Sequence, residues 1–435
     1  MPRDPNQHGS SRSGATRRQF IQTTAVATAG FWVANSLAAE ESKAANEQIN
    51  FACVGIGGKG SSDTGGAAAH GKIVGICDVD TQRLDGAANR YKDAEKFTDF
   101  REMLDKLGDK IDAVTVSTPD HSHAPAALKA MKMGKHCFCQ KPLTHTIWEA
   151  REMGKVAEAK GLATQMGNQG TSHDGLREAA AVLKAGTLGK VSEVHVWTNR
   201  PVWPQGGDKP AATEPPAHLE WDMWLAGAKE RPFGKGYHPF SWRGFWDFGT
   251  GALGDMACHT MNMPFMGLDL LNPTSVQAES SGHNGYSYPK WSVITFEFPK
   301  NSTRDALTVY WYDGGKRPPS ELFDGQQPGS SGCLIVGEKG KIYTPDDYGA
   351  NWKFLGGDLE KPKVEFPKSP GHVQEWVRAI RGGDAAMSNF PNYASPLTET
   401  ILLGNLAVWA TGEEGKSKKI EWDSQSLKAK DMPEL

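Results

Sequence analysis

The stretch Ile49-Asn-Phe-Ala-Cys-Val-Gly-Ile-Gly-Gly-Lys-Gly60 decides the fold of this chain. An apolar run meets a glycine-rich turn, and small residues follow from Thr64 to Ala69. Strand, glycine turn and helix in this order predict a dinucleotide-binding unit, because the glycines allow the tight turn, the approach of a pyrophosphate and close packing of helix on strand. The pyrophosphate would lie at the helix N-terminus, where unpaired amides attract anions. The residues expected to contact the dinucleotide are Gly55, Ile56, Gly57 and Gly60.

A second apolar run, Lys72 to Cys77, ends in Asp78. This acid follows the glycine motif at about the ~20-residue spacing of a carboxylate that accepts hydrogen bonds from the adenosine ribose. Its presence favours NAD over NADP. Arg83 is close enough in sequence to contact a ribose phosphate instead, so NADP remains the alternative.

The same alternation continues along the chain. Apolar runs at 113–117 and 136–139 are each followed by a helical pattern, at 123–133 and 148–160. Strands that alternate with helices of this length form a parallel sheet covered on both faces. We therefore predict an α/β fold with a Rossmann domain over residues 48–165.

The second half of the chain has a different pattern, from residue 166 to residue 435. Runs that alternate with a period of two predict strands in a largely antiparallel sheet. These runs lie at 193–198, 292–298, 306–312 and 333–337, with a final edge strand at 419–423. Helical patterns lie at 176–184, 373–381 and 398–410. We predict that residues 166–435 form an α+β domain that binds substrate.

Three motifs stand outside this framework. Ser117-Thr-Pro-Asp-His-Ser-His123 and Cys139-Gln-Lys-Pro-Leu143 follow two strands of the predicted parallel sheet, at the edge where such sheets bind ligands. The third, Thr250-Gly-Ala-Leu-Gly-Asp-Met-Ala-Cys-His259, opens with glycines. Together they resemble the family that groups glucose-fructose oxidoreductase, inositol dehydrogenase and MocA, whose members show T-P-x-x-x-H, E-K-P and D-x-x-x-H in this order. The resemblance covers nearly all of the chain after its N-terminal segment.

This resemblance implies an NAD(P)-dependent oxidoreductase that acts on a secondary alcohol of a sugar, cyclitol or sugar acid. It implies that Lys141 lies between nicotinamide and substrate, that Asp255 orients the polyol and that His259 exchanges the hydroxyl proton. The spacing agrees, because Asp255 and His259 are four residues apart and share one face of a helix. A carboxylate near an imidazole can hold it in one orientation. The motif residues expected at the cofactor are Ser117, Thr118, Pro119, His123, Gln140 and Lys141.

One position departs from the family pattern. Gln140 stands where an acidic residue usually precedes the lysine. The change removes a negative charge beside Lys141 and leaves open how well that lysine supports proton transfer.

An aromatic, proline-rich segment connects two of the predicted strands, and we call residues 200–249 the excursion. A segment this rich in Trp, Tyr, His and Arg that leads into the third motif is typical of a substrate wall or lid. Packing onto the second domain is the alternative. The expected substrate contacts are Tyr237, His238, Trp242 and Arg243 in the excursion, with Asn168 and Gln169 where relatives often place sugar-contacting residues.

The bulk properties exclude several classes of function. The chain has 48 Lys and Arg against 51 Asp and Glu, a net charge of −3, so nothing attracts nucleic acid broadly. Six cysteines in 435 residues are too sparse for a disulfide framework, and we interpret all six as free thiols. A metal could be held by His121, His123 and the pair of Asp255 and His259, but no further clustered ligand completes a zinc site, so no metal is expected.

The N-terminus predicts an export signal. Thr16-Arg-Arg-Gln-Phe-Ile21 precedes an alanine-rich run without charge that reaches Leu37. This is the layout of a twin-arginine signal, here residues 1–39, followed by a linker at 40–47. The route carries proteins that fold first, so a cofactor would be inserted in the cytoplasm and taken to the periplasm. No later segment reaches the ~18 apolar residues of a membrane span.

Three functions remain open at this point. The first is the sugar oxidoreductase, as a dimer or tetramer by family likeness. The second is a glycoside hydrolase that uses bound NAD for a transient oxidation, with no net redox change. The third is an inactive binding homologue, which the departure at Gln140 favours and the intact Lys141, Asp255 and His259 oppose.

Overall fold

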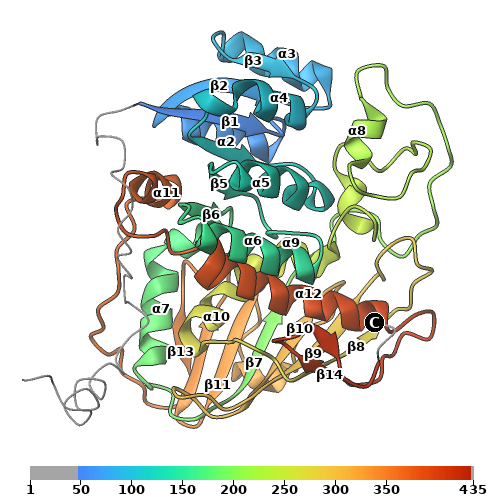
Figure 1. Ribbon diagram of the computed structural model, residues 1–435. Coiled ribbons are helices and arrows are strands. Elements are labelled where there is room, and N and C mark those ends of the chain that lie inside the picture. The colour runs from blue at the N-terminus through green and yellow to red at the C-terminus, as the bar shows by residue number, and fades with distance from the viewer. Residues whose placement is uncertain (1–47, 433–435) are drawn as a thin grey trace, which may run out of the picture. The chain divides into compact units, whose positions relative to one another are not determined.

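Two sheets organise the chain, one after the other along the sequence (Figure 1). The computed structural model describes residues 48–432. The predicted signal at 1–39 and linker at 40–47 lie outside the described residues.

The first sheet is six-stranded and parallel throughout, which confirms the predicted Rossmann fold. Its order is β3-β2-β1-β4-β5-β6. The strands are β1 (Ile49–Val54), β2 (Gly71–Cys77), β3 (Glu95–Phe97), β4 (Ala113–Val116), β5 (His136–Cys139) and β6 (Thr164–Met166). The order reverses between β1 and β4, and such a switch point is where these sheets bind ligands.

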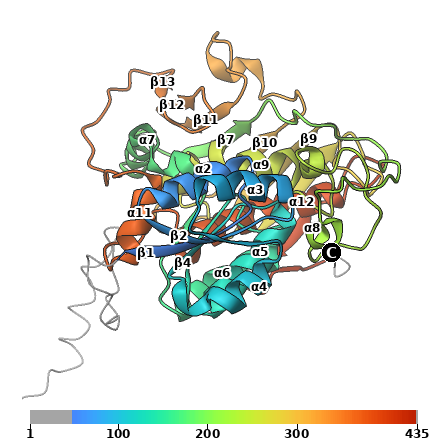
Figure 2. The same cartoon turned by 90° about the horizontal axis from the view of Figure 1, so that it is seen from above.

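Helices cover both faces of this sheet (Figure 2). On one side lie α2 (Lys59–Ala68) and α3 (Thr81–Arg90), and on the other α4 (Phe100–Leu107), α5 (His123–Lys132) and α6 (Ile147–Ala159). Burial on both faces explains why the central strands are apolar without alternation. Phe51, Ala52 and Cys53 of β1, for example, have no exposed surface.

The second sheet has nine strands in the order β13-β12-β11-β7-β10-β9-β8-β14-β15. Neighbouring strands in this sheet run antiparallel, except that β7 and β10 run parallel to each other. The expectation of a largely antiparallel sheet is therefore confirmed. The strands are β7 (Val191–Trp197), β8 (Ser275–Ser280), β9 (Ser292–Phe298), β10 (Leu307–Tyr312), β11 (Gly332–Gly337), β12 (Gly340–Thr344), β13 (Lys353–Leu355), β14 (Ile420–Asp423) and β15 (Lys428–Ala429).

One strand expectation was wrong. The run at 419–423 was predicted as the edge, but β14 pairs with β8 on one side and with β15 on the other. The chain reverses directly after β14, where Asp423 Oδ1 accepts from the backbone amide of Gln425 (3.0 Å), and the returning residues form the true edge strand.

Helices from the second half lie between the two sheets. These are α7 (Asp174–Lys184), α9 (Gly251–Thr260), α10 (Asn262–Leu268) and α12 (Ser395–Trp409). Figure 1 shows α12 between α6 and the second sheet. Most of α12 is buried on all sides, as a helix between two layers should be. Arg151 of α6 forms an ion pair with Glu399 of α12 (2.6 Å), which joins the layers.

A late helix returns to the first sheet. The side chain of Trp376 in α11 (His372–Ile380) packs on Phe51 and Phe138, with ring centroids 5.6 and 5.7 Å apart. Its indole Nε1 donates to the carbonyl of Ala163 (3.1 Å). The C-terminal part of the chain therefore closes one face of the Rossmann sheet. None of the described helices is both long enough and apolar enough to cross a membrane.

Candidate active site

The glycine turn after β1 has no room for a side chain at Gly55 or Gly60. Gly55 has a φ of +74°, and its amide donates to the carbonyl of Cys77 (2.9 Å). A Cβ on Gly60 would lie 1.9 Å from the carbonyl oxygen of Gly55. At the start of α2 the amides of Gly60 and Ser61 donate to the carbonyls of Gly57 (2.9 Å) and Gly58 (3.2 Å). These features fit a bound dinucleotide, with Gly55, Ile56, Gly57 and Gly60 as its cradle.

Asp78 supports this turn. Its Oδ2 accepts from the backbone amide of Ile56 (3.0 Å) and its Oδ1 from that of Asp80 (3.0 Å). Burial raises the pKa of Asp78 above its usual range. A carboxylate oxygen can accept more than one hydrogen bond, so a ribose hydroxyl can still bind to Asp78.

Arg83 lies beside Asp78 at the cofactor edge. Its Nε is 3.3 Å from Oδ2 of Asp80. A Cβ placed on Gly57 would meet the Arg83 side chain at 2.4 Å, so the guanidinium lies across the second glycine of the motif. The contact between Arg83 and the cofactor stays a prediction.

Gln140 bonds to a carboxylate that the sequence did not point to. Its Nε2 donates to Oδ2 of Asp63 (2.8 Å), which also accepts from Oγ of Ser117 (2.8 Å). Lys59 forms an ion pair with the other oxygen of Asp63 (3.1 Å). The position next to Lys141 is neutral, but a negative charge lies one hydrogen bond away.

The turn at 117–119 is tied to the Lys141 loop by His123. The imidazole is buried, and its nitrogens face the carbonyls of Pro142 (2.9 Å) and Thr118 (2.8 Å). Burial lowers the pKa of His123. His123 thus holds two motif loops together, and Pro119 begins the short 3-10 helix that leads to it.

Lys141 and Asp255 form the centre of the site. Lys141 Nζ donates to Oδ1 of Asp255 (2.7 Å) and to its backbone carbonyl (2.8 Å). Arg243 Nε lies 3.0 Å from the same carboxylate, and Arg200 Nε lies 3.6 Å from it. Burial alone would raise the pKa of Asp255, but Lys141 and Arg243 outweigh it, so the pKa is lowered and the group is ionised.

His259 lies one turn further along α9 and is 4% exposed. Burial, helped by the charge of Lys141, lowers the pKa of His259 well below its usual value, so the imidazole is neutral. Its Nδ1 has no hydrogen-bond partner in the described part of the chain. The edge of Tyr348 packs on the ring, with centroids 4.9 Å apart.

One expected interaction is absent. Asp255 and His259 do lie on one helix, but no hydrogen bond joins them among residues 48–432. The carboxylate turns toward Lys141 and the arginines, which offer it charged donors. In the described structure the carboxylate therefore does not hold the imidazole by a hydrogen bond, and the ring of Tyr348 packs on the imidazole.

The excursion contains a packed aromatic cluster. Tyr237 is 1% exposed and stacks on Trp221 of α8 (Trp221–Leu225), with centroids 5.9 Å apart. Trp242 is also buried in this cluster. Both side chains pack within the excursion, whereas the alternative interpretation had expected packing onto the second domain.

His238 faces the cofactor edge instead of the catalytic cluster. Its Nε2 lies 3.2 Å from Oδ2 of Asp80. The neighbouring backbone agrees, because the amide of Thr81 donates to the carbonyl of His218 (2.8 Å) and the amide of Glu220 to that of Val79 (2.9 Å). The excursion therefore packs on the connection between β2 and α3.

Asn168 and Gln169 follow β6. Asn168 has no exposed surface, its Oδ1 accepts from Ser388, and its Nδ2 has no hydrogen-bond partner in the described structure. Gln169 is partly exposed at the start of a 3-10 helix. Of the two, Gln169 has the surface that a ligand can reach.

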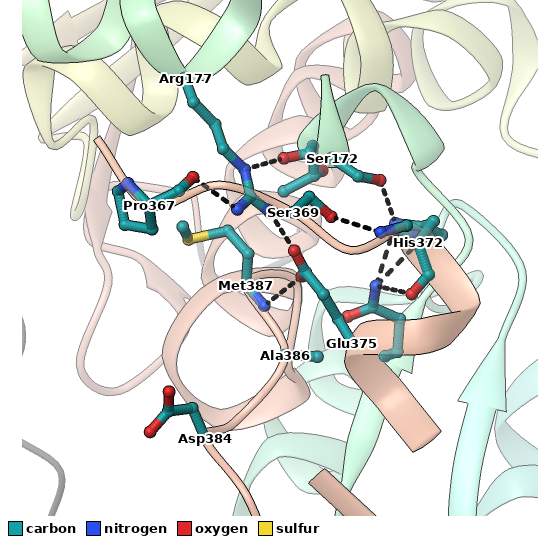
Figure 3. A network of polar contacts seen from close by, with 12 residues as sticks. Ser172, Arg177, Pro367, Ser369, His372, Glu375, Asp384, Ala386 and Met387 are labelled. Atoms are coloured by element: carbon teal, nitrogen blue, oxygen red, sulfur yellow. Dashed lines mark hydrogen bonds and ion pairs between the residues drawn. The ribbon is translucent and has the colours of Figure 1, made fainter. Parts of the chain in front are cut away.

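A polar network supports this corner of the site (Figure 3). Arg177 forms a buried ion pair with Glu375, and its Nε donates to the carbonyl of Thr171 (2.8 Å). His372 bonds to Ser172 Oγ (3.0 Å) and to the carbonyl of Met166 (2.8 Å). Burial lowers the pKa of His372 to about 4.

Sequence reasoning missed Arg200, Tyr348 and His372. Arg200 opens the excursion three residues after β7, and the end of a strand is a signal that could have singled it out. Tyr348 and His372 lie in connections with no motif of their own. Only the tertiary pairing brings them to α9 and β6.

Two family models match the chain. One is described as an oxidoreductase family with an NAD-binding Rossmann fold and covers residues 49–168. The other is the C-terminal alpha/beta domain of the same oxidoreductase family and covers residues 180–427.

Curated relatives match over shorter stretches. Inositol 2-dehydrogenase of Rubrobacter xylanophilus is 34% identical over 118 residues, which are 26% of this chain and 32% of that protein. The 1,5-anhydro-D-fructose reductase of Ensifer adhaerens is 35% identical over 115 residues, again 26% and 32%. The matches thus span about a third of the length of these relatives.

Solved structures match over most of the chain. The WlbA dehydrogenase of Bordetella pertussis, solved with NADH and UDP-GlcNAcA, has a TM-score of 0.60 at 18% identity and covers 87% of this chain and 99% of its own. An aldose-aldose oxidoreductase of Caulobacter crescentus has a TM-score of 0.57 at 16% identity and covers 86% and 100%. These likenesses show the shared fold.

Proposed function

Since this chain belongs to the Gfo/Idh/MocA family of NAD-binding oxidoreductases, we propose that it transfers a hydride between a bound nicotinamide cofactor and a secondary alcohol of a sugar, cyclitol or related polyol. The observation that carries the proposal is the cluster of Lys141, Asp255 and His259. It brings a lysine from the carboxyl edge of the Rossmann sheet within 2.7 Å of a carboxylate on α9.

When bound, the nicotinamide would accept the hydride from the alcohol or donate it to the ketone. Asp255 is anionic and fixes the position of the Lys141 amine through a 2.7 Å hydrogen bond. His259 is neutral, and its Nδ1 is free to accept a hydrogen bond. In the proposed reaction the Lys141 amine hydrogen-bonds the alcohol oxygen, and His259 takes or returns the hydroxyl proton.

Two substitutions test this function. We expect Lys141→Ala and His259→Ala each to reduce kcat/KM for an identified polyol by about a hundredfold or more, the size of a lost proton-transfer group. NAD binding should stay close to that of the parent. Turnover within about threefold of the parent, a loss of only ~0.7 kcal/mol in transition-state stabilisation, would rule out the roles proposed for Lys141 and His259.

Glycoside cleavage through a transient oxidation is the second candidate. It is favoured by the packing of the excursion on the β2–α3 connection, where Asp80 and Leu219 form a β-bridge, because a covered cofactor is suited to recycling in place. Release of the aglycone with no lasting change in the nicotinamide absorbance would select this candidate. An inactive binding protein is the weaker alternative, since the cluster of Lys141, Asp255 and His259 is complete.

We further propose export by the twin-arginine route, with residues 1–39 as the signal. The support is the Arg17-Arg18 pair before an uncharged run. Replacing both arginines with lysine should leave unprocessed protein in the cytoplasm. Export that persists in this variant would argue for another route.

The assembly is proposed to be a dimer or tetramer. Tyr310 and Val293 lie on the face of the second sheet away from the helices and are only partly buried, which gives a second copy an apolar surface. Light scattering of the purified protein distinguishes these states from a monomer.

A further inference from the structure

A single carboxylate meets three cations in the site. Asp255 is the ion-pair partner of Lys141, Arg200 and Arg243, at 2.7, 3.6 and 3.0 Å. None of the three pairs with a second acid in the described structure. Asp120 is also buried near the cluster, but it accepts from Oγ1 of Thr250 (2.6 Å) and forms no ion pair with them. The cluster thus carries two more positive charges than its own carboxylate balances.

Both arginines face Asp255 with Nε at ion-pair distance, and Nε of Arg243 makes no hydrogen bond in the described structure. No hydrogen bond of the terminal nitrogens of Arg243 occurs among residues 48–432, and Arg200 uses only Nη1, toward Oδ1 of Asn199. The two terminal nitrogens of a guanidinium form the fork that binds a carboxylate or phosphate with two parallel hydrogen bonds. That fork is available on Arg243.

Arg243 is held in place. Its guanidinium carbon lies 4.3 Å from the ring centroid of Trp242 and 5.6 Å from that of Trp203. Its backbone is fixed against Gly249, where a Cβ would lie 2.4 Å from the Arg243 Cα. The side chains of Arg243 and Arg200 are 16% and 25% exposed, so solvent screens their charges only in part. Partly buried cations that share one carboxylate are stabilised further when a ligand supplies a second negative charge.

We propose that the substrate is an acidic sugar, whose anionic group binds Arg200 and Arg243 while its alcohol faces Lys141 and His259. The inference rests on the proposed function and narrows its substrate class. A neutral polyol would leave the three cations to share the single carboxylate of Asp255. A sugar carboxylate or a sugar phosphate would satisfy them, and both are oxyanions that match the arginine fork.

The experiment compares matched sugars on two forms of the protein. Binding is followed by the fluorescence of the NADH-loaded protein, and turnover by the absorbance that the NAD-loaded protein gains as the alcohol of the sugar is oxidised. The probes are glucose with glucuronate, galactose with galacturonate, and glucose 6-phosphate, which separates phosphate from carboxylate. The variants are Arg243→Gln, Arg200→Gln and the conservative Arg243→Lys. Arg101→Gln is the control. Arg101 is an exposed arginine on α4 and pairs with Asp99 (2.7 Å), the residue that caps this helix.

We expect at least one acid to bind about tenfold or more tightly than its neutral partner, the strength of one hydrogen bond between charged groups. Arg243→Gln and Arg200→Gln should each reduce this acid-to-neutral ratio by about tenfold. Arg243→Lys should reduce the acid-to-neutral ratio by a smaller factor, and the control variant should leave this ratio unchanged.

The outcomes separate this inference from the proposed function. Equal binding of acid and neutral sugar by the parent, or an acid preference that survives both glutamine variants, overturns the inference. If the arginines only position Asp255, both sugars weaken together and the ratio does not move, which also overturns it. Acid binding that depends on the arginines without turnover of any sugar would keep the inference and reject the oxidoreductase.

Discussion

At the scale of single residues, the protonation of the site depends on charge as much as on burial. The pKa of His259 is lowered by burial first and by the Lys141 charge second. Lys141 also keeps Asp255 ionised. A neutral imidazole has one unprotonated nitrogen, which can accept the hydroxyl proton.

This coupling is measurable without turnover. In Lys141→Met the positive charge near His259 is gone, so the pKa of His259 should rise toward its ordinary value near 6.5. NMR titration of the imidazole resonances in the parent and the variant follows the change. Arg101→Gln serves as the control and should leave the titration unmoved. A pKa of His259 that is the same in Lys141→Met as in the parent would contradict the coupling.

The motifs predicted that Lys141, Asp255 and His259 would converge, and the structure places the first two in contact. Sequence could not predict where the carboxylate would turn, because a helix face fixes two positions but not their rotamers. Arg200 and Tyr348 are further examples. Each lies in a connection, and its place in the site depends on strand pairings that link distant parts of the chain.

At the scale of elements, the glycine turn is the most tightly constrained part of the cofactor site. We expect Gly60→Ala to lower the melting temperature by several degrees and to weaken NAD binding strongly. The reason is that its Cβ would clash with the Gly55 carbonyl at 1.9 Å, and backbone atoms cannot move aside cheaply.

Gly86→Ala is the matched control for this variant. Gly86 lies inside α3, and nothing lies within 4 Å of a Cβ built there. Alanine should be neutral or stabilising by up to ~1 kcal/mol. Calorimetry with and without NAD compares the two variants. If the Gly60→Ala protein melted at the same temperature as the parent and bound NAD equally well, the turn would not be sterically constrained at Gly60.

The excursion was predicted as a substrate wall from its aromatic composition. The structure divides it, with Arg243 at the catalytic cluster and His238 at Asp80. Composition alone cannot show what such a segment does, because the same aromatic residue type can either pack in a core or bind a sugar. The aromatic cluster around Tyr237 is the packing that holds both ends in position.

We predict that His238→Ala speeds NAD dissociation by about threefold to tenfold, the effect of one lost hydrogen bond. The imidazole contacts Asp80 next to Asp78 and closes the excursion over this edge. Phe240→Ala is the control, because Phe240 lies in the same segment and is 51% exposed. Stopped-flow displacement of NADH measures the rate. Equal rates in the two variants would remove His238 from the cofactor site.

At the scale of the whole molecule, buried histidines make the fold sensitive to acid. Burial lowers the pKa of His121 to about 4, and it also lowers those of His123 and His259. In the unfolded chain these groups take up protons near pH 6.5, while in the folded state they resist. The unfolded state therefore binds more protons as the pH falls, and the free energy of unfolding decreases.

We expect denaturant unfolding at pH 5 to show a free energy several kcal/mol lower than at pH 7.5, of which His121 contributes about 2 kcal/mol. Asp313, whose pKa burial raises to about 6, works in the opposite direction by about 1 kcal/mol. His121→Gln should reduce the slope of stability against pH. A free energy that is unchanged or higher at pH 5 would contradict this account.

The two sheets and their types were predictable, since the hydrophobic period changes near residue 166 from that of a parallel sheet to that of an antiparallel one. The return of α11 to the first sheet was not. An amphipathic helix pattern shows that one face is buried but not which layer covers it, and here Trp376 selects Phe51 and Phe138 of the Rossmann sheet.

The most direct test of the central claim follows the nicotinamide absorbance of the NAD-loaded protein while sugars and sugar acids are added, with Lys141→Ala in parallel. The account predicts that one compound builds the reduced-nicotinamide signal as its keto product appears in step, and that Lys141→Ala binds NAD but builds the signal at least about a hundredfold more slowly. A parent protein that does not bind NAD, or a signal that forms equally fast in Lys141→Ala, would contradict it.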